Sequence, residues 1–262
     1  MTASAGEYRL YSDLAPWWPL ISPPGEYAAE TARLAEALRA AGGGVPRVLD
    51  LGSGGGHVAW HLAEGGAFDL TLVDLSPQML EVSRRLNPGL EHIVGDMRTI
   101  RLGRSFDGVI VHDAVDYITT RDDLALVAAT AFAHCRPAGV ALFVPDHVRD
   151  TFAEIKGGGG GSEPGGQMAS FIEHTWDPDP ADDWVLAEYE FTLRNADGSE
   201  AVISEAHRLG AFSRATWLRV LGEAGFAVSR WRADLPRAGD DGDGEGGGPA
   251  NLFIGRRPDG DG

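Results

Sequence analysis

The part of the sequence best suited to binding a ligand is a glycine-rich stretch, Val48-Leu-Asp-Leu-Gly-Ser-Gly-Gly-Gly56. A strand pattern ends at Leu51, and the glycines that follow let the backbone pass close to a ligand at the start of a helix. Asp74 lies roughly 20 residues farther on, at the end of the next strand pattern, where a carboxylate can accept both hydrogen bonds of a ribose diol. These features predict a nucleotide-binding site at the carboxyl ends of two neighbouring parallel strands.

Two details of this stretch indicate the kind of nucleotide. The dinucleotide pattern G-x-G-x-x-G would place a glycine at the sixth position, which is His57 here. Asp50 precedes the first glycine by two positions, and its charge would repel a pyrophosphate at short range. The stretch therefore favours a ligand with a cationic group, such as the ammonium or sulfonium of a methionine derivative.

The stretch Asp50-Leu-Gly-Ser-Gly-Gly-Gly56 resembles the D/E-x-G-x-G-x-G signature of class I S-adenosylmethionine-dependent methyltransferases. Leu72 to Leu80 resembles that family's acidic ribose-binding segment, and Gly95-Asp-Met97 resembles its adenine-binding segment. Phe106-Asp107 and Arg136-Pro-Ala-Gly139 also match the family pattern. The resemblance implies that S-adenosylmethionine is the cofactor. With the N-terminal Tyr11, the residues expected to bind it are Tyr11, Tyr27, Asp50, Gly52, Ser53, Gly54, Asp74, Leu75, Met79, Asp96, Met97 and His112.

Within the family, the chain is most similar to enzymes that dimethylate the amine of nucleotide-linked amino sugars. The similarity rests on Tyr27-Ala-Ala-Glu30, on Gly95-Asp-Met-Arg98 and on an antiparallel run that ends near Glu205-Ala-His-Arg208. The loop His112-Asp-Ala-Val-Asp-Tyr117 departs from the more apolar, serine-rich version of that group, and Ile118 stands where a polar residue is expected. The resemblance therefore implies transfer of a methyl group to nitrogen or oxygen of a small molecule, as in secondary metabolism, and leaves the acceptor open.

Methyl transfer from a sulfonium is an in-line displacement, so positioning and exclusion of water supply much of the rate. We expect neither a metal nor a covalent enzyme intermediate; His57 and His61 have a helical spacing but no third ligand with suitable spacing. A general base matters when the acceptor carries a proton, as an amine or a hydroxyl does. The catalytic candidates are His112, Tyr117 and His207, with Asp116 and His147 as further polar groups near the acceptor. For each of them, an ordinary structural hydrogen bond is the alternative.

Strand and helix patterns alternate around these motifs, which predicts a parallel sheet with helices on both faces. We expect strands at 47–51, 70–74, 91–94, 106–111 and 140–144, then two closing strands at 226–231 and 251–255. Cap residues Ser76, Thr120 and Ser213 mark three helix starts. The expected fold is therefore an α/β Rossmann-like, mostly parallel seven-stranded sheet flanked by helices.

The alternation breaks after Asp146. Residues 157–166 are so rich in glycine that we expect a flexible loop. Three strand-like runs at 168–176, 184–194 and 201–209 then predict an antiparallel meander. The predicted organisation is an N-terminal lid segment (1–25), a cofactor-binding core (26–146 and 210–262) and an antiparallel β cap over the active site (147–209).

Two segments allow a second account. The aromatic stretch from Tyr11 to Trp18 either closes over the cofactor as a lid or packs the N-terminal segment onto the core. The acidic, glycine-rich residues 239–248 lack the bidentate glutamate of a calcium loop and are interpreted as a solvated, disordered loop.

The composition restricts the partners. The 262 residues carry a formal net charge of −17, which argues against nucleic acids and anionic membranes as principal partners and favours small acceptors. One cysteine, no signal-peptide pattern and no apolar run long enough to span a bilayer indicate a soluble cytoplasmic protein and leave a homodimer open. Two alternatives stay open: an NAD(P)-dependent oxidoreductase on a similar sheet, and a non-catalytic methyltransferase-like binding subunit.

Overall fold

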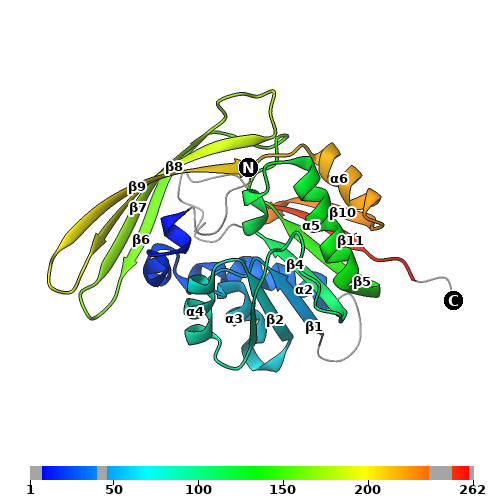
Figure 1. Cartoon of the computed structure of the whole chain (residues 1–262), viewed down its shortest axis with the longest axis horizontal. Coiled ribbons are helices and arrows are strands. Elements are labelled where there is room, and N and C mark those ends of the chain that lie inside the picture. Colours follow the sequence, from blue (N-terminus) through cyan, green and yellow to red (C-terminus); the bar gives the residue numbers. More distant parts are fainter. Residues whose placement is uncertain (1–7, 40–45, 236–249, 260–262) are drawn as a thin grey trace.

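The protein contains two β-sheets joined by helices and by an N-terminal segment (Figure 1). The computed structural model describes residues 8–39, 46–235 and 250–259. The larger sheet has seven strands in the order β10-β11-β5-β4-β1-β2-β3, and the smaller has four in the order β6-β7-β8-β9. No helix in these ranges is both long and apolar enough to cross a membrane.

The larger sheet contains the strands predicted from the alternating pattern. Its first five strands run parallel, and only β11 is antiparallel to its neighbours β5 and β10. This confirms the mostly parallel, Rossmann-like sheet. Its strands are β1 (Arg47–Leu51), β2 (Asp69–Asp74), β3 (Glu91–Val94), β4 (Phe106–His112), β5 (Cys135–Val144), β10 (Ala227–Leu235) and β11 (Ala250–Arg256). Since β1 to β5 are parallel, the loops that follow them meet at one edge of the sheet.

Helices cover both faces of the larger sheet. Leucines of α2 and α3 pack with Val48, Leu70 and Ile110 on one face. On the other face, α5 and α6 pack with Leu49 and Val109. The helices are α2 (Ala28–Arg39), α3 (His57–Ala63), α4 (Pro77–Leu86), α5 (Arg121–His134) and α6 (Arg214–Glu223), with a 3-10 turn η4 (Glu64–Gly66) after α3. The predicted caps are present, because the hydroxyls of Ser76, Thr120 and Ser213 each accept a backbone N–H from the first turn of the helix that follows.

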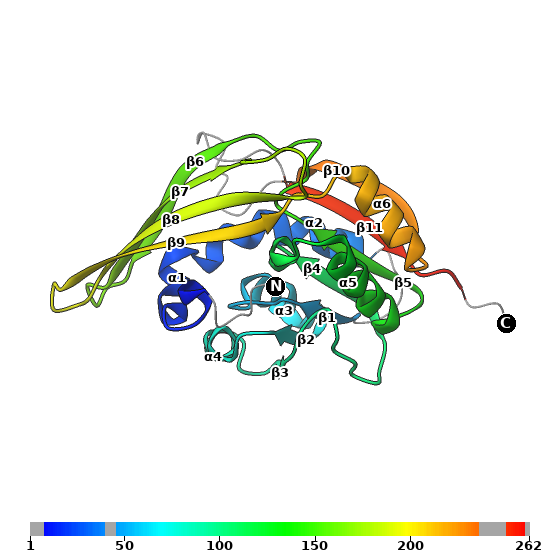
Figure 2. The same ribbon diagram turned by 45° about the horizontal axis from the view of Figure 1, so that its top comes forward.

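The N-terminal segment lies between the two sheets, as both views show (Figures 1 and 2). It forms η1 (Arg9–Tyr11), η2 (Ala15–Trp17), α1 (Trp18–Ile21) and η3 (Pro24–Tyr27). Leu10, Leu14 and Ile21 share an apolar cluster with side chains of the smaller sheet, whereas Ala15 packs on Met79 of α4. The segment therefore joins the smaller sheet to the helix that follows β2.

The smaller sheet is an antiparallel meander that arches over the N-terminal segment (Figure 2). Its strands are β6 (Ile155–Ser162), β7 (Met168–Trp176), β8 (Trp184–Arg194) and β9 (Glu200–Gly210). Along β8, buried Val185, Ala187 and Phe191 face the inside of the arch and alternate with more exposed residues. This alternation is what the sequence pattern predicted for a half-buried strand.

The expectation of a flexible loop at 157–166 was wrong. Residues 157–162 belong to β6, which pairs with β7 in continuous register from Ile155 to Ser162. Sheet hydrogen bonds offset the entropy that glycine loses on ordering. The glycines are also required by space, because a Cβ at Gly158 or Gly160 would meet the backbone of β7. The segment 239–248, interpreted as a solvated loop, lies outside the described residues.

A glycine substitution in β6 tests this close approach. We expect Gly160→Ala to lower the free energy of unfolding by about 1–3 kcal/mol, because the new methyl group would meet the Ala169 carbonyl and because φ at Gly160 is +139°. Gly157→Ala is the matched control, since its Cβ would meet nothing within 4 Å. Urea unfolding of the two variants gives the comparison, and equal stabilities would contradict the proposed packing of β6.

Candidate active site

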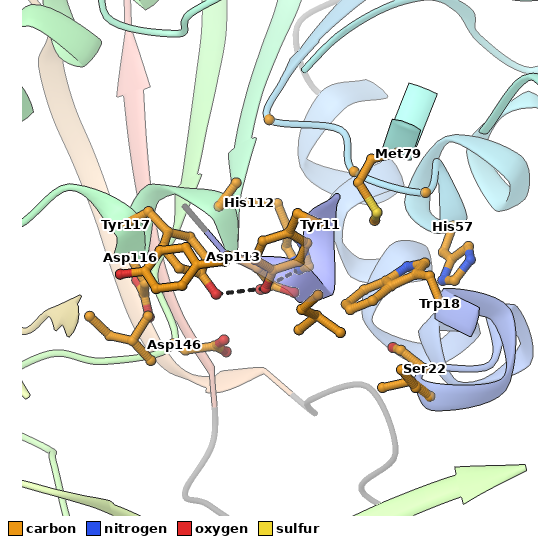
Figure 3. A pocket seen from close by; sticks show the side chains of 18 of the residues that line it. Tyr11, Trp18, Ser22, His57, Met79, His112, Asp113, Asp116, Tyr117 and Asp146 are labelled. Atoms are coloured by element: carbon orange, nitrogen blue, oxygen red, sulfur yellow. Dashed lines mark hydrogen bonds and ion pairs between the residues drawn. The ribbon is translucent and has the colours of Figure 1, made fainter. Parts of the chain in front are cut away.

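A cavity of about 540 Å³ opens between the carboxyl edge of the larger sheet, the N-terminal segment and the smaller sheet. Figure 3 shows Met79, Trp18 and His57 on one side of it, and Tyr117 and Asp146 on the other. Eleven of the twelve predicted cofactor residues and two of the three catalytic candidates take part in its wall. Asp50 lies buried behind the wall and His207 lies buried beneath it.

The glycine turn after β1 has the conformation that the sequence suggested. Gly52, Gly54 and Gly56 all have positive φ angles, of +86°, +53° and +75°, a region that other residues rarely occupy. The N–H groups of Gly52 and Ser53 donate to the Val73 carbonyl at 2.7 and 3.0 Å, which ties the turn to β2. A Cβ at Gly52 would collide with Ala114, so the turn also approaches the loop after β4 closely.

Asp74, the last residue of β2, holds the turn from the other side. Its Oδ2 accepts the N–H of Gly54 at 2.7 Å, and its Oδ1 accepts the N–H of Ser76 at 2.8 Å. Burial raises the pKa of the Asp74 carboxyl, and these two backbone donors act in the opposite direction. Each oxygen keeps a second acceptor position, so the carboxylate can also receive the hydroxyls of a ribose.

The adenine side of the predicted site lies after β3. Asp96 and Met97 line the cavity with Leu75 and Met79. The guanidinium of Arg98 forms a salt bridge with Asp96 at 2.6 Å and lowers the pKa of that carboxyl, although burial opposes the shift. The methionine side chains offer an apolar surface to a planar base, while Asp96 is fixed in place by its neighbour.

Asp50 acts from behind the glycine turn. Its side chain is 3% exposed, and burial raises the pKa of its carboxyl to about 7, with Asp74 adding to the shift and His112 opposing it. An acidic group with so little solvation favours a positive charge nearby. This environment would stabilise the cationic ligand group that the sequence predicts.

His112, at the end of β4, is surrounded by carboxylates. Its Nε2 lies 3.0 Å from Glu30 Oε2 and 3.2 Å from Asp113 Oδ1. Burial opposes protonation, yet the charges of Asp113 and Glu30 raise the pKa of His112 to about 10. These carboxylates favour the protonated imidazole, which has no free lone pair, so the environment disfavours His112 as a general base.

The other two catalytic candidates are hydrogen-bonded to each other. The Tyr117 hydroxyl lies 2.9 Å from Nδ1 of His207, and on its other side 2.6 Å from the hydroxyl of Tyr11. Tyr27, by contrast, bonds Ser22 at 2.8 Å at the edge of the cavity. The structure therefore brings Tyr11, Tyr117 and His207 together and leaves Tyr27 apart from them.

Several residues of the wall were not among the site residues predicted from the sequence. Asp113 and Asp146 follow the carboxyl ends of β4 and β5, a position that marks site residues in parallel sheets and would have identified both. Asp113 also has a φ of +40°, which is strained for a residue with a side chain. Glu30 belongs to the Tyr27-Ala-Ala-Glu30 motif but was not among the predicted site residues, whereas Glu173 and the glycines of β6 reach the cavity only through tertiary packing.

Comparisons with known proteins agree with this geometry. A family model described as a methyltransferase domain matches residues 48–139. A dTDP-3-amino-3,4,6-trideoxy-alpha-D-glucopyranose N,N-dimethyltransferase of Streptomyces venezuelae is 27% identical over 232 residues, covering 88% of this chain and 91% of that protein. A dTDP-3-amino-3,6-dideoxy-alpha-D-glucopyranose N,N-dimethyltransferase of Streptomyces fradiae is 27% identical over 231 residues, covering 87% and 89%.

Solved structures give the same result. The crystal structure of Streptomyces venezuelae DesVI matches with a TM-score of 0.73 and 25% identity, over 89% of this chain and 92% of that one. CalS10, an amino pentose methyltransferase from Micromonospora echinaspora solved with S-adenosylmethionine bound, matches with a TM-score of 0.71 and 25% identity, over 88% and 91%. These findings confirm the prediction of a methyltransferase over the oxidoreductase and over the non-catalytic subunit.

Asp74 gives the most direct test of cofactor binding. We expect Asp74→Ala to weaken binding of S-adenosylhomocysteine by about 1.5–3 kcal/mol, the cost of losing charge-assisted hydrogen bonds. Calorimetric titration measures the dissociation constant. Asp69→Ala, at the exposed start of the same strand, is the control. An unchanged constant for Asp74→Ala would show that the ribose binds elsewhere.

Asp50 gives a pH test. With a pKa of about 7 in the folded protein against an ordinary 3.8, Asp50 holds a proton that the unfolded chain releases. This contribution to stability therefore falls as the pH rises toward 7. We expect Asp50→Asn, which does not titrate, to gain roughly 2 kcal/mol relative to the wild type between about pH 5 and about pH 7. Urea unfolding without cofactor measures this, and a pH-independent difference would contradict the buried environment of Asp50.

The site and the comparisons point to the same cofactor. The glycine turn, the oriented Asp74 and the methionine-lined surface beyond it suit a nucleoside, and the buried Asp50 suits a sulfonium or ammonium group. The relatives that match along most of the chain are methyltransferases of small molecules. The protein is thus an S-adenosylmethionine-dependent methyltransferase that acts on a small molecule.

Proposed function

We propose that this methyltransferase transfers methyl groups to the amino nitrogen of an amino sugar, bound in the half of the cavity under the smaller sheet. Residues 147–209 act as the cap over this acceptor, and the N-terminal segment up to residue 25 acts as the lid over the cofactor. The N,N-dimethyltransferase relatives act on amino groups of dTDP-linked sugars, which supports this choice of acceptor.

The observation that carries the proposal is the charge of the cavity wall. Carboxylates from separate elements line it, including Glu30, Asp113, Asp146 and Glu173. Desolvation and the neighbouring Asp146 raise the pKa of Asp113 well above its ordinary range. Repulsion and desolvation disfavour the negative charges of this wall, and a bound cation would stabilise them. An ammonium group therefore fits this half of the cavity better than a neutral hydroxyl.

The wall provides few cationic groups that could bind a diphosphate. Arg98 is the arginine among the residues described in the wall, and its guanidinium bonds Asp96 at 2.6 Å and Asp123 at 3.5 Å. A nucleotide-linked sugar would need its phosphates outside this acidic region. The acceptor panel below therefore includes an amino sugar without the nucleotide.

The chain's own residues position the acceptor and exclude water. Bound S-adenosylmethionine supplies a methyl group, which forms a C–N bond with the amine lone pair as its C–S bond breaks and S-adenosylhomocysteine leaves. Asp113 and Asp146 attract the amine, whereas His112, which lies beside Asp113 and Glu30, offsets part of the negative charge of the wall. The cap covers the cavity and removes solvent, which strengthens these interactions.

An acceptor panel tests the function. We expect transfer of one or two methyl groups to dTDP-3-amino-3,6-dideoxyglucose or to free 3-amino-3-deoxyglucose, and none to the matched 3-hydroxyl sugars. Mass spectrometry of the products measures this. Methylation of the hydroxyl sugars alone would overturn the proposal.

The same panel tests the acidic wall. Asp113→Asn keeps the shape and relieves the backbone, since asparagine tolerates positive φ, but removes the charge. We expect it to raise KM for the amine about tenfold or more, with S-adenosylhomocysteine binding unchanged. Asp122→Asn, on the exposed first turn of α5, is the control.

A further inference from the structure

Three side chains form an unbroken hydrogen-bonded chain from the cavity into the smaller sheet. The hydroxyl of Tyr11 lies 2.6 Å from that of Tyr117, which lies 2.9 Å from Nδ1 of His207. Figure 3 shows the first of these links at the centre of the site. Both tyrosines line the cavity, whereas His207 has no exposed surface and lies behind them on β9.

The surroundings of His207 set the direction of the chain. Its Nε2 faces Glu205 Oε2 at 3.8 Å, and a carboxylate favours an N–H on the nitrogen that faces it. Nδ1 is then the acceptor. Tyr117 therefore donates to His207 and accepts from Tyr11, which leaves the oxygen of Tyr11 free to accept a proton from the cavity.

Glu205 is fixed in its charged form. The backbone N–H groups of Arg9 and Leu10 donate to its two oxygens at 2.6 and 2.9 Å. Although burial opposes it, the nearby His207 ring and these backbone donors lower the pKa of the Glu205 carboxyl. The negative charge of Glu205 therefore lies beside the imidazole ring of His207.

We propose that Tyr11, Tyr117 and His207 relay the proton of the acceptor ammonium out of the cavity. The inference rests on the proposed amine methylation, because an ammonium nitrogen has no lone pair until it loses a proton. That proton passes to the Tyr11 oxygen as the Tyr11 hydroxyl proton moves to Tyr117 and the Tyr117 proton moves to Nδ1 of His207. Both tyrosines end as they began, His207 becomes an imidazolium, and Glu205 balances its charge.

The properties of the tyrosines suit a relay. Burial raises the pKa of both Tyr11 and Tyr117 well above the ordinary value, so they stay neutral and pass protons without ionising. Two other tyrosines lie beside these hydrogen bonds: the ring centroids of Tyr8 and Tyr189 are 4.0 and 5.1 Å from that of His207. The charges of the Asp74 and Asp113 carboxylates act on Tyr11. Each of these carboxylates favours an incoming positive charge.

The hydrogen-bonded chain of Tyr11, Tyr117 and His207 also accounts for the apolar residue at position 118. Ile118 stands where a polar group was expected, and its side chain is buried in the apolar cluster of α5. The imidazole comes instead from β9, ninety positions farther along the chain from Tyr117. In this protein the cap therefore contributes to the proton path as well as covering the acceptor.

The test is the pH dependence of kcat/KM for Tyr117→Phe, with whichever amine of the acceptor panel the wild type methylates. The wild type removes the proton inside the site and keeps its activity near pH 7. We expect the variant to lose about 100-fold at pH 7, the scale of general-base catalysis, and to recover toward pH 10, where the amine is already neutral in solution. His207→Asn should shift the profile in the same direction.

Two controls separate a relay from a merely structural chain. Tyr189→Phe removes a neighbouring hydroxyl, and His174→Asn changes a histidine of the same sheet that pairs with Glu154; both should keep the wild-type shape of the pH profile. An equal loss for Tyr117→Phe at every pH would overturn the relay and show that the chain only fastens the N-terminal segment. Wild-type failure on every amine would instead contradict the proposed function, and the relay with it.

A second measurement needs no turnover. Long-range ¹H–¹⁵N spectra identify the tautomer of each neutral histidine, and the signals missing from His207→Asn assign those of His207. The relay requires a proton on Nε2 and none on Nδ1. A proton on Nδ1 would mean that Tyr117 accepts from His207, which would overturn the proposed direction.

Discussion

The site depends on one interaction, the hydrogen bonding of the Asp74 carboxylate to the glycine turn. Asp74 binds the N–H of Gly54 with one oxygen and that of Ser76 with the other, so it joins the turn after β1 to the cap of α4. The Ser76 hydroxyl in turn accepts the N–H of Met79 and donates to the Tyr11 carbonyl. The cofactor turn, the helix after β2 and the N-terminal segment are therefore positioned by one short network of hydrogen bonds.

The acceptor half of the cavity is built differently. Its wall comes from parts of the chain that are far apart in sequence, and charge rather than a local motif unites them. Glu30 of α2, Asp113 after β4 and Asp146 after β5 converge around His112. Glu30 is buried, Asp113 and Asp146 are partly buried, and His112 offsets part of their charge. Grouped carboxylates of this kind favour a further cation nearby, which is why we propose this wall as the site of the acceptor amine.

The residues proposed for the cofactor half could be predicted from the sequence because their signals are local. A strand, three glycines with positive φ and an aspartate at the next strand end lie within one stretch, and each has a fixed structural meaning. The acceptor half has no such signature. His207 and Tyr117 were both candidates, but their contact depends on how the smaller sheet folds over the larger one. The prediction of a loop at the β6 glycines was wrong because composition indicates only the entropic cost of ordering glycine. It does not show that the backbone of β7 lies so close that side chains would collide with it.

We propose that the acceptor's amine lies between the acidic wall and Tyr11, across from the cofactor. A crystal structure with S-adenosylhomocysteine and an amino sugar bound tests it most directly. We expect the ribose hydroxyls at Asp74 and the amino nitrogen within hydrogen-bonding distance of the Tyr11 hydroxyl, with Asp113 or Asp146 as its nearest carboxylate. A sugar bound with a hydroxyl in that place and its amine turned to solvent would contradict it.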